Sequence, residues 1–181
     1  MKHLYYIRHG QSQANVDMTW GGDTPLTTLG IDQAIAAGIK AAAKQFMPDI
    51  ILVSPLQRAQ KTAQLVAEGI GYPPDKIVTD AGLHERDMGK VTGTPFGDSG
   101  PGSSNYHLMD DIDTVESYAD LQVRAKAYYE EINKRPEDTI LLVGHAAFGR
   151  ALKRVLTNRP YTDEYELEYA PIPNAEIFKL I

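Results

Sequence analysis

The chain of 181 residues contains no cysteine. This absence excludes disulfide bonds, thiolate metal sites and any mechanism with a cysteine nucleophile. A long apolar run is also lacking, because no stretch approaches the roughly 18 consecutive apolar residues that a membrane-spanning helix requires. Arg8 and His9 interrupt the apolar N-terminal run, so we predict no secretory signal peptide, no membrane association and a cytoplasmic location.

Basic residues are in the minority, with 18 Lys and Arg against 24 Asp and Glu and a formal net charge of −6. This balance argues against nucleic acid as a partner, since nucleic acid requires a basic face. An anionic ligand would need a local positive pocket, which a few oriented groups can supply inside an acidic protein.

Lys and Arg are absent altogether from Val91 to Val123, where Asp and Glu accumulate. Gly and Pro cluster in the same stretch, between Gly93 and Gly102. This composition predicts a lid or insertion at about residues 91–116, either mobile or ordered as a cap. The chain length predicts a single domain over residues 1–181.

Short apolar runs alternate with stretches of helical periodicity. We predict strands at residues 5–7, 50–53, 76–79, 139–144 and 176–180, and helices at 29–46, 117–134 and 148–156. A further helix follows the second strand, with Ser54 as its N-cap and Pro55 as its first residue, which places Arg58 in the first turn. The alternation predicts an α/β fold, a three-layer sandwich whose mostly parallel sheet carries helices on both faces.

Two of the predicted strands run directly into a histidine. Arg8-His9-Gly10 follows the first strand and Gly144-His145 follows the strand at 139–144, at the sheet edge where α/β proteins bind ligands. A neutral imidazole at His9 could attack phosphorus and form a phosphohistidine. The planar donor fork of Arg8 matches phosphoryl oxygens, and Gly10 lets the backbone approach an anion closely.

Two further residues complete a candidate phosphate site. Arg58, at the start of its helix, stands beside free backbone N–H groups that suit an anion. Glu85 is the first strong candidate for a general acid, a role that would require a raised pKa at neutral pH.

Four linked motifs occur in order along the chain: Arg8-His9-Gly10 with Asn15, Ser54-Pro55-Leu56-x-Arg58-Ala59-x-x-Thr62-Ala63, Leu83-x-Glu85-x-x-x-Gly89, and Gly144-His145. Pro25-Leu26-Thr27, followed by Gly30 and Gln33-Ala34, fits the same pattern. In these motifs the chain resembles the histidine phosphatase superfamily, with its phosphoglycerate mutase-like fold, over nearly its whole length. The resemblance implies that fold for this chain.

The resemblance also implies roles for individual residues. His9 would be the nucleophile, and Glu85 would protonate the leaving oxygen and then activate water. The phosphoryl oxygens would be bound by protein cations, so no metal and no cofactor is implied. The implied catalytic residues are His9, Glu85, Arg8, Arg58 and His145, and the implied substrate-binding residues are Arg8, Asn15, Gly22, Arg58, His145 and Ala146. The expected partner is a small phosphorylated metabolite.

The choice between phosphatase and mutase depends on the segment after the acid loop. Mutases of this family use further Lys and Arg there, and in this chain that segment has none. The mutases also have Glu-Arg followed by x-Tyr-Gly, whereas this chain keeps Glu85-Arg86 but has Met88 in place of the tyrosine. We therefore favour hydrolysis of a phosphomonoester. Phosphoglycerate mutase-type transfer and a non-catalytic phosphate-ester-binding module remain alternatives. Arg86 could contact the substrate or be a solvated loop residue.

Two other patterns compete with this interpretation. Asp111-Ile112-Asp113 resembles the nucleophile motif of haloacid dehalogenase-type phosphatases but lacks the buried strand that must precede it. His3, His84 and His107 follow no metal-ligand spacing. We expect specificity to lie in residues 92–114 and 18–23, where Trp20, Phe96 and Tyr106 could contact an organic leaving group or pack the lid onto the body.

Overall fold

The computed structural model describes residues 2–99, 106–157 and 172–181. Its strands are β1 (His3–Arg8), β2 (Ile50–Val53), β3 (Ile77–Thr79), β4 (Thr139–Gly144) and β5 (Ile177–Lys179). Its α-helices are α1 (Gln13–Val16), α2 (Thr28–Ala43), α3 (Gln57–Ile70), α4 (Tyr118–Asn133) and α5 (Ala146–Leu156). Within this part of the chain, no helix is long and apolar enough to cross a membrane.

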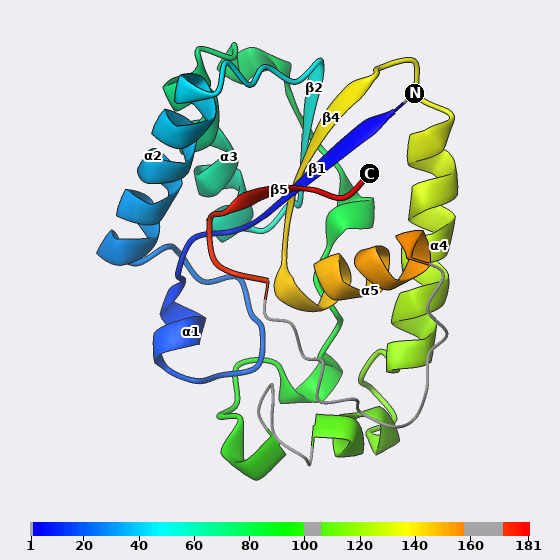
Figure 1. Ribbon diagram of the computed structural model, residues 1–181. Helices are drawn as coiled ribbons and strands as arrows, with labels where there is room; N and C mark the ends of the chain where they lie inside the picture. Colours follow the sequence, from blue (N-terminus) through cyan, green and yellow to red (C-terminus); the bar gives the residue numbers. More distant parts are fainter. Residues whose placement is uncertain (1, 100–105, 158–171) are drawn as a thin grey trace.

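The sheet has the strand order β3-β2-β4-β1-β5. The first four strands are parallel, and β5 pairs antiparallel with β1. Helices α2 and α3 lie on one side of the sheet and α4 and α5 on the other (Figure 1). The predicted α/β sandwich with a mostly parallel sheet and helices on both faces is therefore confirmed.

Alternating side chains of the central strands form two apolar cores, one on each face of the sheet. On one face, Tyr6, Leu52 and Leu142 pack against α4 and α5. On the opposite face, Ile7, Ile51 and Val143 pack against α2 and α3. Burial on both faces explains why these strands read as continuous apolar runs rather than as an alternating pattern.

Several predicted boundaries are wrong by two or three residues. Helix α3 begins at Gln57 with Leu56 as its N-cap, so Ser54 is not the cap. The Ser54 hydroxyl instead lies 2.7 Å from His145 Nε2, a tertiary contact that local sequence does not show. Helix α5 begins at Ala146 rather than Phe148. Helix α2 ends at Ala43, before Pro48, and the chain reverses at Gln45, whose φ is 54°.

The pairing of β1 with β4 brings the two motif histidines together. Arg8 is in register with Gly144 at the carboxyl ends of these strands, and the His9 N–H donates to the Gly144 carbonyl at 2.9 Å. The His9 carbonyl in turn accepts from Asn174 Nδ2 at 2.7 Å. The main chain of His9 is thus held from both sides.

A single buried hydroxyl fixes the main chain of His145. Tyr6 Oη donates to the His145 carbonyl at 2.7 Å and accepts from the His145 N–H at 2.8 Å. The Tyr6 side chain is fully buried, so no water can replace it at these two backbone groups. Burial raises the pKa of Tyr6, which keeps the hydroxyl protonated and able to donate.

The described part of the acidic segment packs as a cap over the loop at residues 18–20. The main-chain N–H of Trp20 donates to the Thr94 carbonyl at 2.9 Å, and the main-chain N–H of Phe96 donates to the Met18 carbonyl at 2.8 Å. Trp20 and Met88 form a small apolar cluster with Met109 and Val115 of the segment. Whether this segment moves stays a prediction, and residues 100–105 lie outside the described part. Asp111 ends a 3-10 helix rather than a buried strand, so the dehalogenase-type motif lacks its structural context.

We expect Tyr6→Phe to lower the free energy of unfolding by about 1–3 kcal/mol, because it leaves two buried backbone groups of His145 without a partner. Urea denaturation monitored by circular dichroism measures this change. Tyr5→Phe is the matched control, since the Tyr5 ring packs edge-on against Phe46 and its hydroxyl bonds to none of the described residues. Equal stability of the two variants would contradict the role assigned to the Tyr6 hydroxyl.

Candidate active site

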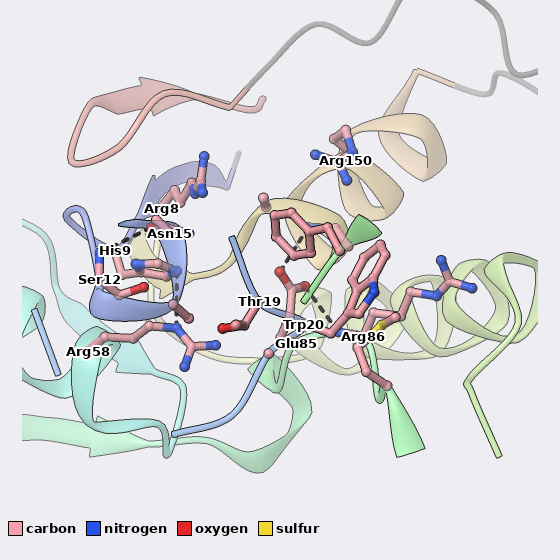
Figure 2. Close-up of a pocket in the computed structure, with 16 residues that line it drawn as sticks. Arg8, His9, Ser12, Asn15, Thr19, Trp20, Arg58, Glu85, Arg86 and Arg150 are labelled. Carbon is pink, nitrogen blue, oxygen red and sulfur yellow. Dashed lines mark hydrogen bonds between the residues drawn. The ribbon is translucent and has the colours of Figure 1, made fainter. Parts of the chain in front are cut away.

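A pocket opens at the carboxyl edge of the sheet, between the start of α5 and the loop at residues 18–21 (Figure 2). It is lined by Arg8, His9, Ser12, Ala14, Asn15, Thr19, Trp20, Gly21, Arg58, Glu85, Arg86, Met88, Phe96, Ala146, Ala147 and Arg150. The first strand, α3, the loop after β3 and α5 therefore all contribute to one cavity.

The hydrogen bonds of His9 define its tautomer. Its Nδ1 lies 2.6 Å from the Gly10 carbonyl, which can only accept, so Nδ1 carries the proton. Arg58 Nε donates to His9 Nε2 at 3.1 Å, so Nε2 presents its lone pair. Burial lowers the pKa of His9 well below its ordinary value, and the nearby His145, Arg58 and Arg8 add to this effect. His9 is a neutral imidazole with a nucleophilic Nε2.

Arg58 is a buried residue of the site, with an exposed fraction of 4%, so the interpretation as a solvated helix residue is wrong. Its Nη1 donates to the Gly22 carbonyl. Thr62, one turn further along α3, accepts from the Gly10 N–H at 3.1 Å and donates to the Arg58 carbonyl at 2.8 Å. Thr62 thereby ties the first turn of α3 to the loop that carries His9.

His145 is fully buried beside His9, with ring centroids 5.2 Å apart. Burial lowers the pKa of His145 well below its ordinary value, and the Arg58 charge lowers it further. Leu56 N–H donates to Ser54 Oγ, whose own proton is then available for His145 Nε2. In that arrangement the proton of neutral His145 lies on Nδ1, a buried atom with no partner among the described residues.

Glu85 lies at the N-terminus of α5. Its Oε1 accepts from Phe148 N–H at 2.9 Å and from Arg86 N–H at 3.0 Å, and its Oε2 accepts from Ala147 N–H at 3.1 Å. Burial raises the pKa of Glu85, but these three backbone donors outweigh it and the net pKa is lowered. Glu85 is therefore a carboxylate in this structure, opposite to the raised pKa that a general acid would need.

The other predicted binding residues divide into two groups. Arg8, Asn15 and Ala146 line the pocket, as predicted. Gly22 does not line it and instead accepts the hydrogen bond from Arg58, while His145 is not a lining residue but packs edge-on against the His9 ring. The roles of all these residues in binding or catalysis stay predictions.

Sequence reasoning missed several residues that line the pocket, among them Ser12, Thr19, Ala147 and Arg150. Arg150 could have been found, because it follows Ala146 by four positions on α5 and so shares its face. Figure 2 shows Arg150 on the α5 side of the pocket. Its charge contributes to lowering the pKa of Glu85.

Arg86 is buried, with an exposed fraction of 3%, so its interpretation as a solvated loop residue is wrong. It forms an ion pair with Asp110, and its Nε donates to the Glu116 carbonyl at 2.7 Å. Arg86 lines the pocket while it joins the loop of Glu85 to the acidic segment.

The family described as "Histidine phosphatase superfamily (branch 1)" matches residues 4–180. A 2,3-bisphosphoglycerate-dependent phosphoglycerate mutase from Bartonella bacilliformis is 35% identical over 168 residues, which cover 84% of this chain and 80% of that protein. The mutase of the same name from Mesorhizobium japonicum is 32% identical over 178 residues, covering 91% of this chain and 86% of that protein.

Among solved structures, a mycobacterial glucosyl-3-phosphoglycerate phosphatase in complex with VO3 superposes with a TM-score of 0.79 at 27% identity. The superposition covers 99% of this chain and 92% of that chain. The sequence relatives thus carry the name of a mutase, and this structural neighbour carries the name of a phosphatase.

We expect the ¹⁵N spectrum of the histidine side chains at pH 6 to show His9 as a neutral imidazole protonated on Nδ1. The reason is that burial lowers the pKa of His9 below 6.5, so the imidazole stays neutral at a pH where a free imidazole is mostly charged. A His9→Gln spectrum assigns the resonances. A charged His9 at pH 6, or a proton on Nε2, would contradict the tautomer derived from the Gly10 and Arg58 contacts.

Proposed function

The chain belongs to the histidine phosphatase superfamily, and from that premise we propose that it is a metal-independent phosphatase acting on a small phosphomonoester. The observation that carries the proposal is the state of His9. A neutral, Nδ1-protonated imidazole lies in a pocket with a guanidinium at its Nε2 and a carboxylate across the cavity. These are a nucleophile, an oxyanion-binding group and a proton carrier.

Binding of the substrate exchanges one contact for others. Arg58 Nε now donates to the lone pair that must attack phosphorus. Phosphoryl oxygens are stronger acceptors than an imidazole nitrogen, so the guanidinium fork would turn to them and free Nε2. Arg8 and Asn15, which line the pocket, would bind the remaining phosphoryl oxygens. His145 Nδ1, which has no partner among the described residues, would donate to them from its position beside His9.

In the first step, His9 Nε2 would form a bond to phosphorus as the bond from phosphorus to the ester oxygen breaks. The leaving oxygen would take a proton from Glu85 and depart as an alcohol, which leaves phosphohistidine and a carboxylate. In the second step, Glu85 would take a proton from water as the water oxygen bonds to phosphorus and the N–P bond breaks. The products are inorganic phosphate and neutral His9, and atoms and charge balance.

The proton of the first step needs a source, because the pKa of Glu85 is lowered in this structure. A phosphomonoester retains one proton below its second pKa of about 6. A phosphoryl dianion beside Glu85 would raise the pKa of this carboxyl by repulsion between like charges. We infer that the ester enters as a monoanion and that its proton passes to Glu85 in the complex.

The interpretation as a phosphatase is supported by the composition beyond the acid loop and by the phosphatase among the structural neighbours. A mutase must bind a second phosphoryl group, and the segment from Val91 to Val123 supplies no Lys or Arg for it. Phosphoglycerate mutase activity is the second candidate, because the 35% identical relative carries that name.

We expect the protein to hydrolyse p-nitrophenyl phosphate in excess EDTA, and His9→Ala to abolish this turnover at unchanged circular dichroism. Glu85→Gln should slow hydrolysis of an alkyl phosphate roughly 10²- to 10⁴-fold, the usual contribution of a general acid and base. Turnover undiminished in His9→Ala would refute the mechanism.

Conversion of 3-phosphoglycerate to 2-phosphoglycerate without release of phosphate, followed by ³¹P NMR, would identify a mutase. Binding of esters without either reaction would identify a binding module.

We expect kcat/KM to be maximal on the acid side of pH 7. The lowered pKa of His9 keeps the nucleophile neutral below pH 6.5, so the acid limb lies at low pH. As the pH rises through about 6, the ester loses the proton that the reaction needs, and the rate falls. Initial rates with an alkyl phosphate between pH 4 and 8 measure the profile, and a value of kcat/KM that still rises at pH 8 would contradict it.

A further inference from the structure

We propose that Arg124 of α4 is a positioning residue that holds the loop of Glu85, and with it the carboxyl group, in the geometry required for proton transfer. The proposal rests on the proposed function for its catalytic consequence. Arg124 does not line the pocket, so it acts through Glu85 rather than on the substrate.

The loop of Glu85 has no hydrogen-bonded secondary structure of its own. It runs between the 3-10 helices Ala81–Leu83 and Gly89–Val91. A proton carrier on such a loop needs support from elsewhere in the protein, because a displacement of about 1 Å can cost roughly 10²-fold in rate.

Arg124 supplies this support through three main-chain carbonyls, one in the 3-10 helix before the loop and two in the loop itself. Its Nη1 donates to the His84 carbonyl at 3.0 Å and to the Gly82 carbonyl at 3.3 Å. Its Nη2 donates to the carbonyl of Glu85 itself at 3.2 Å. The guanidinium therefore bonds the main chain before His84, at His84 and at Glu85, which is the proposed proton carrier.

Glu116 pairs with the charge of Arg124 and also bonds the main chain of Asp87, which follows Glu85 in the loop. Its two carboxylate oxygens accept from Arg124 Nε at 2.8 Å and from Nη2 at 2.9 Å. Glu116 Oε2 also accepts from the Asp87 N–H at 3.1 Å, and its own N–H donates to the Asp87 carbonyl at 2.8 Å. The loop is thus held both before and after Glu85 by one ion pair.

Arg124 also contacts the residue that orients the carboxyl group. Its Cζ lies 5.0 Å from the centroid of the Phe148 ring, within the range of a cation–π contact. The Phe148 N–H is one of the donors to Glu85 Oε1. Arg124 therefore bonds the main chain of Glu85 directly and also packs on Phe148, whose N–H holds the Glu85 carboxylate.

Only arginine fits this set of contacts. A guanidinium carries five N–H donors in a rigid plane, whereas a lysine ammonium has three donors on one atom and cannot span a carboxylate and three carbonyls. Arg124→Lys should therefore keep the charge and loosen the loop, which separates geometry from electrostatics.

The experiment compares esters with good and poor leaving groups. Departure of p-nitrophenolate needs little help from an acid, whereas an alkoxide must be protonated. Rapid-quench measurement of alcohol release in the first turnover isolates this step from hydrolysis of the phosphohistidine. We expect Arg124→Lys to slow release from an alkyl phosphate by about tenfold or more and release from p-nitrophenyl phosphate by less than about threefold, the pattern of Glu85→Gln in weaker form.

Lys126→Gln is the matched control, because Lys126 is exposed on the same helix and contacts none of the loop carbonyls. We expect it to change neither rate. Equal slowing of both esters in Arg124→Lys, or a loss of thermal stability with unchanged rates, would show that Arg124 is merely structural and would overturn the proposal.

A second measurement does not depend on turnover. In a ¹³C titration of the glutamate carboxyl groups, Arg124→Lys should move the pKa of Glu85 up towards its ordinary value, because the loosened loop loses its alignment with the N–H groups of α5. If the unmodified protein releases no alcohol from either ester, the proposed function fails. The titration still decides about Arg124, and an unchanged pKa of Glu85 in Arg124→Lys would overturn its positioning role.

Discussion

The parallel pairing of β1 with β4 is the interaction on which the site depends. With Arg8 opposite Gly144, the two strands end together and deliver His9 and His145 to adjacent positions. The Tyr6 hydroxyl then fixes the backbone of His145 from inside β1. Two imidazoles in contact at a buried position, with Arg58 beside them, disfavour protonation of either one. The same packing that forms the core therefore favours the neutral form of both imidazoles.

Glu85 is buried as well, but it stays charged because backbone N–H groups donate to its carboxylate. The N-terminus of α5 offers the N–H groups of Ala147 and Phe148, and together with the Arg86 N–H these stabilise the carboxylate more than burial destabilises it. The carboxylate lines the same pocket as the guanidinium groups of Arg58 and Arg150, and its charge interacts with both. A phosphoryl dianion would bring like charge to that position, so proton uptake by Glu85 and substrate binding favour each other.

The parts of the site that sequence could predict are those encoded by local pattern. Apolar runs ending in Arg8-His9 and Gly144-His145 predicted the sheet edge, and Arg58 does lie in the first turn of its helix. The contacts of Ser54 and Arg124 could not be predicted, because their partners lie 91 and 39 residues away in the sequence. The lowered pKa of Glu85 likewise depends on α5, 62 residues further along the chain. A local sequence pattern identifies the type of a residue, but not the distant partners that set its pKa and its hydrogen bonds.

The acidic segment and the loop of Glu85 share their supports, and this constrains how specificity can change. Arg86 joins the loop to Asp110, and Met88 packs with Trp20 and Met109 in the cluster beneath the cap. Glu116 ends the segment and anchors both Asp87 and Arg124. A substitution in the segment that changes the shape of the pocket would therefore also disturb the contacts that hold the loop of Glu85. If the proposed roles hold, a change of specificity that disturbs the Arg124 and Glu116 contacts would also change the rate of proton transfer.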